Sequence, residues 1–453
     1  MRARIHYVEM AEALLISTYD MGRQPFGLAS PAAWLRAAGR EVTALDLSRE
    51  KLDDDRIARA ELVGFYLPMH TATRLALPVI ARVRRVNPSA RICAYGVYAP
   101  PNEKILREAG VDALFGGEFE EELTRWAASS MARAPASSSV PRIHFLVPDR
   151  STLPPLARYA TLQLPGGGRR VVGYTEASRG CRHLCRHCPI VPIYNGQFRV
   201  VPPDVVLADI AAQVAAGAEH VTFGDPDFFN GPTHAMRVVD ALHAAHPQVS
   251  YDVTIKVEHL LRHRELLPKL AASGCAFVTS AVESIDDRVL ARLEKHHTRQ
   301  DFVDAVALCR GAGLTLVPTF VAFHPWLTLD GYCDLLETIE SLDLEEHVAP
   351  IQLAIRMLVP EGSRLLELDE VRQLVRGFDP ATLTYRWDHP DPRVDQLQRE
   401  LSQLIGLRLT ADRRSTFDEV SDRAHQAAAR PRAASKPARD RATVPYLNEP
   451  WYC

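Results

Sequence analysis

The chain has 453 residues, of which 47% are hydrophobic and 24% are charged, and both fractions are those of an ordinary globular protein. Its 53 Lys and Arg residues against 56 Asp and Glu residues leave a formal net charge of -3, which excludes a strongly basic surface that would attract nucleic acid or an anionic membrane. The sequence has no run of about 18 uninterrupted apolar residues, so no spanning helix is predicted, and we expect a cytoplasmic protein of two or three domains.

The first 130 residues alternate between short apolar runs and amphipathic segments. The predicted strands are 13–17, 41–47, 61–67, 91–97 and 113–117, and the helical patterns between them include 30–39, 75–86 and 102–110. This alternation predicts a doubly wound, Rossmann-like α/β domain over residues 1–130. A ligand of such a sheet lies beyond the carboxyl ends of the strands, here near residues 19–22, 68–70, 96–98 and 116–118.

A second series of strands and helices follows. Residues 131–150 are rich in Ala, Ser and Pro without a sustained period, and we interpret residues 131–165 as a linker. Within residues 166–365 the predicted strands are 171–177, 220–225, 250–256, 277–283, 314–323 and 350–358. Parallel strands with helical crossovers predict a partial (β/α)6 barrel of the TIM type, whose chemistry lies at the carboxyl-end mouth.

The remainder of the chain is predicted to be mostly helical. Residues 366–426 form a helical region, and residues 427–444 are basic and rich in Ala and Pro, which is typical of disorder. The last nine residues, 445–453, are a separate aromatic tail that ends in Cys453.

Three of the eight cysteines crowd into eight residues. Cys181, Cys185 and Cys188 have the spacing C-x3-C-x2-C, which lets one loop place three thiolates around a face of a [4Fe–4S] cluster and leaves the fourth iron without a protein ligand. A zinc site completed by His183 or His187 is the alternative. Zinc sites usually pair two Cys or His units, and this sequence has no second unit, so the cluster is the predicted occupant.

Around this motif the chain resembles the radical S-adenosylmethionine (SAM) superfamily, over about residues 170–365. The cysteines follow the first predicted barrel strand, Gly-Asp-Pro-Asp at 224–227 closes the second, Glu-Ser at 283–284 closes the fourth, and 293–302 looks like the superfamily's L-x-K-x-x-T helix start. His187 replaces an aromatic residue that is common before the last cysteine. The resemblance implies that the free iron binds the amino and carboxylate groups of SAM.

Seven residues are the predicted cofactor-binding set: Gly224, Asp225, Asp227, Lys256, Glu283, Ser284 and Arg356. The segment 224–227 stands where the superfamily's Gly-Gly-Glu motif binds the cofactor's amino group, although a plain capped turn is the alternative. Lys256 alternates with apolar residues of a strand together with Glu258, so that both point into the barrel or form a surface ion pair. Arg356 lies on an apolar strand, where a guanidinium needs a partner such as the cofactor carboxylate.

The first domain resembles the cobalamin-binding domain that precedes the barrel in one class of radical SAM enzymes. Residues 111–123 resemble that class's stretch ending in Gly-Glu-x-Glu. Residues 19–22 hold Tyr-Asp-Met-Gly where an Asp-x-His-x-x-Gly motif would supply a histidine to cobalt, and residues 95–98 replace the usual Gly-Gly by Tyr-Gly-Val-Tyr. Two interpretations stay open: cobalamin as a further cofactor, and a vestigial domain that shapes the substrate site.

The tail resembles radical SAM proteins named for a CUAEP or CCAEP ending, in which cysteine precedes selenocysteine or a second cysteine. Cys453 is therefore predicted to be a catalytic thiol carried over the barrel mouth, with a reading frame that continues through a selenocysteine codon. The alternative is a docking peptide that buries Trp451 and Tyr452.

Together these features predict an enzyme that cleaves SAM reductively and directs the radical to a small-molecule or peptide substrate. The expected partner is an external electron donor of the flavodoxin or ferredoxin type, with no nucleic acid and no membrane. Transfer of a methyl or 3-amino-3-carboxypropyl group is the alternative reaction. A zinc-binding scaffold is the alternative that is not an enzyme.

Overall fold

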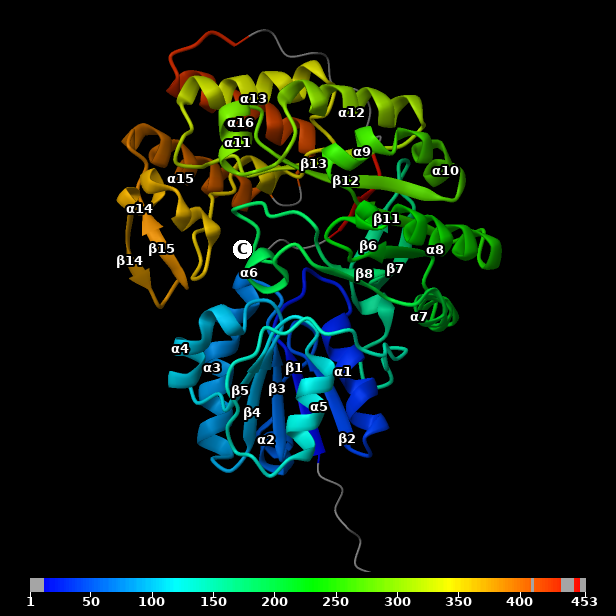
Figure 1. Ribbon diagram of the computed structural model, residues 1–453. Helices are drawn as coiled ribbons and strands as arrows, with labels where there is room; N and C mark the ends of the chain where they lie inside the picture. Colours follow the sequence, from blue (N-terminus) through cyan, green and yellow to red (C-terminus); the bar gives the residue numbers. More distant parts are fainter. Residues whose placement is uncertain (1–11, 409–410, 433–443, 449–453) are drawn as a thin grey trace, which may run out of the picture. The chain divides into compact units, whose positions relative to one another are not determined.

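The computed structural model describes residues 12–408, 411–432 and 444–448 of the chain (Figure 1). The chain divides into two compact units, and the boundary between them falls between Arg158 and Tyr159. Every helix within these ranges is too short or too polar to cross a membrane.

The first unit is built on one parallel sheet with the strand order β2-β1-β3-β4-β5. Its elements are β1 (Glu12–Ser17), α1 (Phe26–Ala37), β2 (Glu41–Asp46), α2 (Asp54–Arg59), β3 (Leu62–Tyr66), α3 (His70–Val86), β4 (Arg91–Tyr95), α4 (Glu103–Glu108), β5 (Ala113–Phe115) and α5 (Glu120–Ala128). This order places the topological switch point between β1 and β3, and it confirms the predicted doubly wound sheet.

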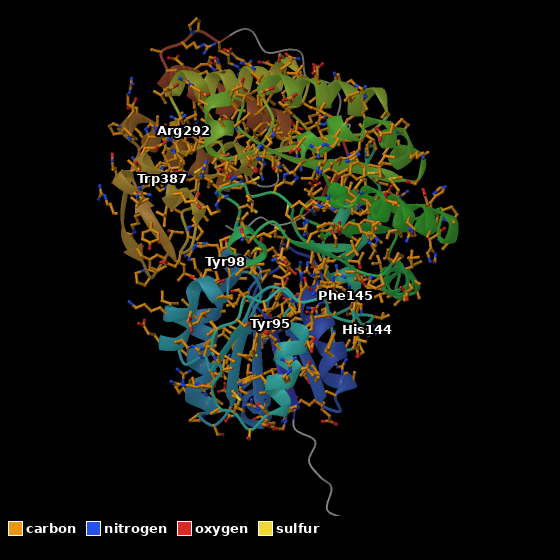
Figure 2. The ribbon with its side chains drawn as sticks, viewed as in Figure 1. Tyr95, Tyr98, His144, Phe145, Arg292 and Trp387 are labelled. Atoms are coloured by element: carbon orange, nitrogen blue, oxygen red, sulfur yellow. The ribbon has the colours of Figure 1, made fainter. Side chains whose placement is uncertain are left out.

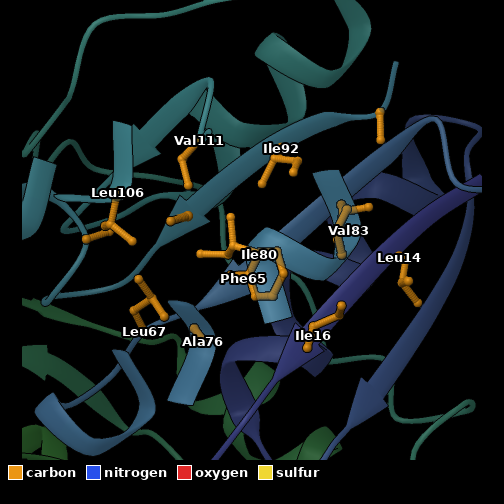
Figure 3. Packing of buried hydrophobic residues seen from close by; sticks show 14 of the residues in the cluster. Leu14, Ile16, Phe65, Leu67, Ala76, Ile80, Val83, Ile92, Leu106 and Val111 are labelled. Carbon is orange, nitrogen blue, oxygen red and sulfur yellow. The ribbon is translucent and has the colours of Figure 1, made fainter. Parts of the chain in front are cut away.

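Each face of this sheet carries its own hydrophobic core, because successive strand residues point to opposite faces. On one face Ile16 and Phe65 pack with Ile80 and Val83 of α3 (Figure 3). On the other face α1 and α5 cover the sheet (Figure 1), and Leu28, Leu35, Leu123 and Trp126 are among the buried residues there. Burial on both faces explains why the strands read as nearly continuous apolar runs.

The segment after α5 packs on the first unit along much of its length. Ser137 forms a parallel bridge with Phe115 and accepts a hydrogen bond of 2.8 Å from the Gly116 amide. Further along, the Asp149 amide donates to Ala29 O, and Gln24 Nε2 donates to Pro154 O, each at 2.9 Å. The composition of this segment predicted a linker. It did not indicate that the backbone of the segment pairs with β5 and so covers that edge of the sheet.

The second unit contains a curved sheet of order β13-β12-β11-β10-β7-β6-β16, with its helices on the outside (Figure 1). Strands β7 and β10–β13 are mutually parallel, whereas β6 is antiparallel to both β7 and β16. Its elements are β6 (Thr161–Gln163), β7 (Arg169–Thr175), β8 (Ser178–Gly180), α6 (Val191–Tyr194), β9 (Phe198–Val200), α7 (Pro203–Ala215), β10 (His220–Phe223), α8 (Pro232–Ala245), β11 (Ser250–Thr254), α9 (Val257–Arg262), α10 (Leu267–Ala272), β12 (Cys275–Glu283), α11 (Asp287–Arg292), α12 (Arg299–Gly311), β13 (Leu316–Phe320), α13 (Leu329–Ser341), α14 (Asp369–Leu374), β14 (Val375–Asp379), β15 (Thr384–Trp387), α15 (Pro392–Leu407), α16 (Arg413–Ala427) and β16 (Tyr446–Leu447). The sheet is the predicted partial barrel.

The sixth predicted barrel strand, 350–358, is not a strand. Pro350–Leu353 form a short 3-10 helix, and the segment then makes a single parallel bridge, between Phe323 and Arg356. The side chain of Gln352 accepts a hydrogen bond of 3.1 Å from the Phe320 amide and so replaces a strand carbonyl at the end of β13. The segment therefore lies where a sixth strand would lie, but a side-chain oxygen takes the place of a backbone carbonyl as the hydrogen-bond acceptor for the edge of β13.

The amino ends of the barrel strands are closed by a polar network and a small apolar cluster. His220 hydrogen-bonds through Nδ1 to Ser250 at 2.7 Å and through Nε2 to Asp252 at 2.8 Å. Leu447 of β16 packs with a cluster that includes Leu162 and Phe277, so the described part of the tail, 444–448, contributes to this floor.

The region after the barrel contains the predicted helices, as α15 and α16, and also an unpredicted hairpin, β14–β15. Trp387 at the end of this hairpin (Figure 2) donates from Nε1 to Met357 O at 3.0 Å. Residues 433–443, most of the segment expected to be disordered, lie outside the described residues. Just before them, Arg430 pairs with Asp334 and Glu337 at 2.7 Å.

Candidate iron–sulfur and cofactor site

The cysteine motif lies on a loop at the carboxyl end of β7, between the paired strands β8 and β9. Gly180 enters this loop with φ +75°, and a Cβ there would lie 2.3 Å from Tyr194 Cδ1 and 2.5 Å from Gln197 O. Only glycine tolerates both the conformation and the close approach. The loop is therefore folded back tightly on α6.

The three thiols share one loop and are little exposed. Cys181 and Cys185 are buried and Cys188 is partly buried. Burial is the main cause that raises the pKa of Cys188 to about 12, and the charges of Cys185 and Cys181 contribute less to this rise. Lys256 Nζ lies 3.8 Å from Cys185 Sγ. A metal centre bound by the loop would be the partner that lets such buried thiols ionise.

Asp225, at the carboxyl end of β10, holds the start of the loop. One carboxylate oxygen accepts a hydrogen bond of 2.9 Å from the Ala177 amide, and the other accepts one of 2.5 Å from Ser178 Oγ. The side chain is 2% exposed, and burial raises its pKa to about 7 although both hydrogen bonds oppose this. The structure thus gives Asp225 protein partners at both oxygens.

Asp227 lies two residues further on and is fully buried among imidazoles. Its Oδ2 is 2.7 Å from His259 Nδ1 and 3.5 Å from His183 Nε2. Burial acts to raise the pKa of Asp227, but His183 and His259 outweigh it and lower the value to about 2. Asp227 is therefore ionised at neutral pH.

Glu283 ends β12 in an unusual backbone conformation. The register of β12 against β13 shifts between Ala281 and Glu283, and Glu283 has φ +70°, which is costly for a residue with a side chain. Such a bulge redirects the side chain, and here the carboxylate meets His187 Nε2 at 3.0 Å and Lys295 Nζ at 3.3 Å. Burial opposes ionisation, but Lys295 and His187 lower the pKa of Glu283 to about 2. The strand end and the cysteine loop are thereby joined.

A cavity of about 330 Å³ opens beside Glu283 and Ser284. Its wall is formed by the segments that follow β12 and β13 and by the first turns of α12 and α13; the residues include Asp287, Arg299, Ala322, His324 and Trp326. His324 is 4% exposed, and its burial lowers the pKa to about 4. A neutral imidazole therefore faces this cavity.

The other predicted cofactor residues have varied surroundings. A Cβ at Gly224 would lie 1.8 Å from Tyr174 Oη, so this glycine is needed for packing. Arg356 is engaged within the protein: its guanidinium lies 2.6 Å from Asp395, donates to Trp387 O at 2.7 Å, and stacks on the Trp387 ring. The prediction that Lys256 and Glu258 alternate on a strand is wrong, because β11 ends at Thr254, Lys256 is the N-cap residue of α9, and Glu258 lies in the first turn of that helix.

Three further residues at the mouth were not in the predicted set: Lys295, His259 and His297. Lys295 and His297 belong to the segment 293–302, whose likeness to a superfamily motif was the available signal. His297 is 6% exposed, and neither ring nitrogen has a hydrogen-bond partner among the described residues. His259 had no signal, because its role depends on the end of β11 being brought beside the end of β10.

In the first unit, aromatic side chains fill the space at the carboxyl ends of β3 and β4. The Tyr95 ring (Figure 2) is fully buried, 4.8 Å from Phe119 and 5.7 Å from Tyr66. The Tyr66 ring in turn lies against α1, where a Cβ at Gly27 would be 2.2 Å from it. Asp20, in the predicted cobalt-side position, is buried. Cys453, the predicted catalytic thiol, lies outside the described residues.

The sequence profile of the Radical SAM superfamily matches residues 175–340, the stretch that holds the cysteine loop and the strand ends described above. Residues 175–340 are a radical SAM domain. The predicted superfamily is thus confirmed, and with it the expectation of an enzyme fold that uses a [4Fe–4S] cluster and SAM.

Curated relatives of this chain are distant. The tRNA-2-methylthio-N(6)-dimethylallyladenosine synthase of Desulfosudis oleivorans is 25% identical over 46% of this chain and 46% of its own length. The hopanoid C-3 methylase of Methylococcus capsulatus is 23% identical over 33% of this chain and 29% of its own. The chain spans less than half the length of either relative.

Solved structures extend the likeness to the first unit. The cobalamin-dependent SAM radical enzyme OxsB, with aqua-cobalamin and SAM bound, has a TM-score of 0.70 at 12% identity, covering 92% of this chain and 72% of its own. The radical SAM methyltransferase TsrM from Kitasatospora setae, with cobalamin and a [4Fe–4S] cluster bound, has a TM-score of 0.62 at 16% identity, covering 93% of this chain and 99% of its own. These likenesses confirm the fold class of an α/β domain followed by a partial barrel.

Proposed function

We propose that the protein is a radical SAM enzyme in which Cys181, Cys185 and Cys188 hold a [4Fe–4S] cluster. The observation that carries this proposal is the loop itself: it holds three thiols of low exposure at the carboxyl end of β7, where Gly180 and Asp225 fix its start. When bound, such a cluster supplies the electron that breaks a carbon–sulfur bond of SAM and yields a radical.

The surroundings of the thiols fit this cofactor. Lys256 near Cys185 and Lys295 near Glu283 bring two buried cations to the same mouth, which suits a cluster that carries net negative charge with its thiolates. His297 and His187 each have a buried ring nitrogen with no hydrogen-bond partner within the described residues. Buried polar atoms are normally satisfied, so these nitrogens support a polar group lying between them.

Other residues at the mouth position the cysteine loop or line the adjoining cavity. Asp225 and Gly180 set the position of the loop, and the Glu283–His187 contact ties it to β12. Glu283 and Ser284 border the cavity beyond β12, and we propose that this cavity receives part of SAM or of a small-molecule or peptide substrate. Lys256 stays a proposed cofactor contact from the end of β11, whereas the two imidazoles beside Asp227 favour a different role for this predicted cofactor residue. Arg356 is less well suited to contact the cofactor, because its guanidinium is already bound to Asp395 and Trp387 within the protein.

The electron has to come from outside the chain, because no second redox centre is implied by the motifs. We propose a flavodoxin or ferredoxin as the donor. Cys453 stays a proposed catalytic thiol.

Anaerobic reconstitution tests the assignment. The wild-type chain is expected to take up about four irons, absorb near about 400 nm, and release methionine or another cleavage product from SAM under reduction. Cys185→Ala should lose iron, absorption and cleavage together. The matched control is Cys275→Ala, which removes a buried thiol on β12, outside the loop, and should retain all three. Full iron in Cys185→Ala, or zinc alone in the wild type, would refute the proposal.

Methyl transfer with cobalamin is the second proposal, and the shared fold with OxsB and TsrM favours it. The aromatic rings of Tyr66, Tyr95 and Phe119 reduce the room for a cofactor between the sheet and α1, which favours the substrate-shaping domain instead. Gel filtration after incubation with hydroxocobalamin separates the two. Coelution of one corrin per chain supports the cobalamin enzyme, and its absence supports the substrate-shaping domain.

A further inference from the structure

A second group of potential metal ligands lies beside the cysteine loop. His183 belongs to the loop, Asp227 follows β10, and His259 lies on α9 after β11. Three neighbouring strands thus deliver two imidazoles and one carboxylate to the same place, since the carboxyl ends of parallel strands share an edge. The rings of His183 and His259 are 4.9 Å apart between centroids.

The ligand atoms of this group converge without satisfying one another. Asp227 Oδ2 lies 2.7 Å from His259 Nδ1 and 3.5 Å from His183 Nε2. Despite these distances, all three atoms are buried and lack a hydrogen bond of acceptable geometry to any described residue. Asp227 is 0% and His259 4% exposed. Buried polar atoms are normally paired, so a bound group that satisfies all three together is expected.

The outer contacts are those of a metal site. The other carboxylate oxygen of Asp227 accepts long hydrogen bonds from the amides of Phe229 at 3.3 Å and Lys256 at 3.4 Å, which leaves Oδ2 free to bind. Glu258 Oε2 lies 3.7 Å from His183 Nδ1, on the far side of that ring. At this distance the two groups make no hydrogen bond, and Glu258 Oε2 has no hydrogen-bond partner among the described residues, so the carboxylate is available to the far nitrogen of a metal-bound His183.

We propose that His183, Asp227 and His259 bind a divalent first-row metal ion, separate from the cluster. Two imidazoles and one carboxylate with open positions suit Fe²⁺, Mn²⁺ or Zn²⁺. Cys181 Sγ lies within 4.8 Å of the ligand atoms of His183 and Asp227, so the ion is adjacent to the cysteine loop. A protonated imidazole paired with Asp227 accounts less well for the group, because it leaves the second imidazole unpartnered.

Mn²⁺ is the probe of choice, because it prefers oxygen and nitrogen to thiolate ligands and its free form has a strong EPR signal. The holoenzyme with its cluster oxidised is titrated anaerobically with MnCl₂, without SAM. We expect one Mn²⁺ per chain, and at least about tenfold weaker binding in Asp227→Asn and in His259→Asn. The control is His263→Asn, whose ring packs 5.8 Å from His259 and which should bind Mn²⁺ like the wild type.

Iron per chain is measured on every variant, so that loss of the cluster is distinguished from loss of the second ion. If Asp227→Asn does not fold, His259→Asn alone carries the test. The proposal is overturned if the wild type binds no Mn²⁺, or if both variants bind it unchanged. It is also overturned if SAM releases the ion in equal amount, because these residues then contact SAM itself.

Discussion

Asp225 illustrates how a single carboxylate can affect cofactor binding through the loop that it holds. Asp225→Ala leaves the Ala177 amide and the Ser178 hydroxyl without acceptors, at about 1–3 kcal/mol each. We expect the reconstituted variant to hold clearly less iron than the wild type. Asp225→Asn should retain it, because the amide oxygen still accepts and the native group, with a pKa of about 7, is already half protonated at neutral pH.

Iron analysis after identical reconstitution checks this expectation. An Asp225→Ala chain with full iron but weakened SAM binding would instead restore the direct cofactor contact that the sequence motif indicates.

His324 makes the second unit sensitive to acid. Its pKa is lowered by burial from 6.5 to about 4, so between these values the unfolded chain binds a proton that the folded chain does not. The stabilisation is complete above pH 6.5 and is lost as the pH falls toward 4. His324→Asn should remove about 2 kcal/mol of the stability loss between pH 7 and pH 5.

Chemical unfolding at the two pH values measures this difference. His296→Asn, at an exposed position of the neighbouring loop, is the control. Equal pH dependence in wild type and His324→Asn would show that the imidazole is already charged in the folded chain.

For single residues, the sequence indicated which side chains belong to the candidate site but not which other side chains they contact. The spacing of Cys181, Cys185 and Cys188 was sufficient to predict that these three thiols share one loop. Neither the φ of Glu283 nor its contact with His187 could be predicted, because both follow from a register shift against β13. The His183–Asp227–His259 group was invisible for a similar reason: no local pattern reports that three strand ends meet.

At the scale of elements, the paired strands β8 and β9 hold the two ends of the cysteine loop together. Gly180→Ala would bring a Cβ within 2.5 Å of both the Tyr194 ring and Gln197 O at a φ of +75°. We expect the loop to open and iron uptake to fall by half or more, measured as iron per chain. Gly231→Ala is the control, since a Cβ there meets only ordinary contacts, from 3.5 Å outward. Normal iron in Gly180→Ala would mean that the loop can be formed without this turn.

Elements with strong periodicity were predicted closely, whereas short ones were not. Strands β10 to β13 fall within or beside the predicted runs, because buried parallel strands are continuous apolar segments. The segment 350–358 is equally apolar, but it begins with Pro350 in a 3-10 helix and pairs with the neighbouring chain through only one bridge. The β14–β15 hairpin was missed because its strands are short and their burial does not alternate from residue to residue.

At the scale of the whole molecule, a ligand stabilises the unit that binds it. We expect cluster loading to increase amide protection in the second unit, above all in the cysteine loop and at the ends of β10, β11 and β12. The strands β1–β5 should change little, because every proposed cluster contact lies beyond residue 159. Hydrogen exchange with and without the cluster measures this. A comparable gain in β1–β5 would show that the two units respond as one.

The order of the two units was predictable from the two series of alternating runs, and both sheets were confirmed. The boundary was less well predicted. The Ala-, Ser- and Pro-rich composition of 131–150 suggested a free connection, yet Ser137 and Asp149 are hydrogen-bonded to the first unit. Composition indicates whether a segment tends to form a helix or a strand. It does not indicate whether a segment without regular structure will hydrogen-bond to the edge of a sheet.

The two buried lysines at the barrel mouth also bear on how the protein has to be handled. Lys256 and Lys295 are 6% and 2% exposed, and each has one carboxylate nearby, Glu258 at 3.9 Å and Glu283 at 3.3 Å. The proposed cluster with its thiolates would add negative charge beside both lysines, so its destruction by oxygen would weaken the pairing of two buried charges. Protein prepared in air is therefore expected to be less stable than protein that holds the cluster. Crystals and stability data should come from chain that has been filled with iron and sulfide before it meets any other treatment.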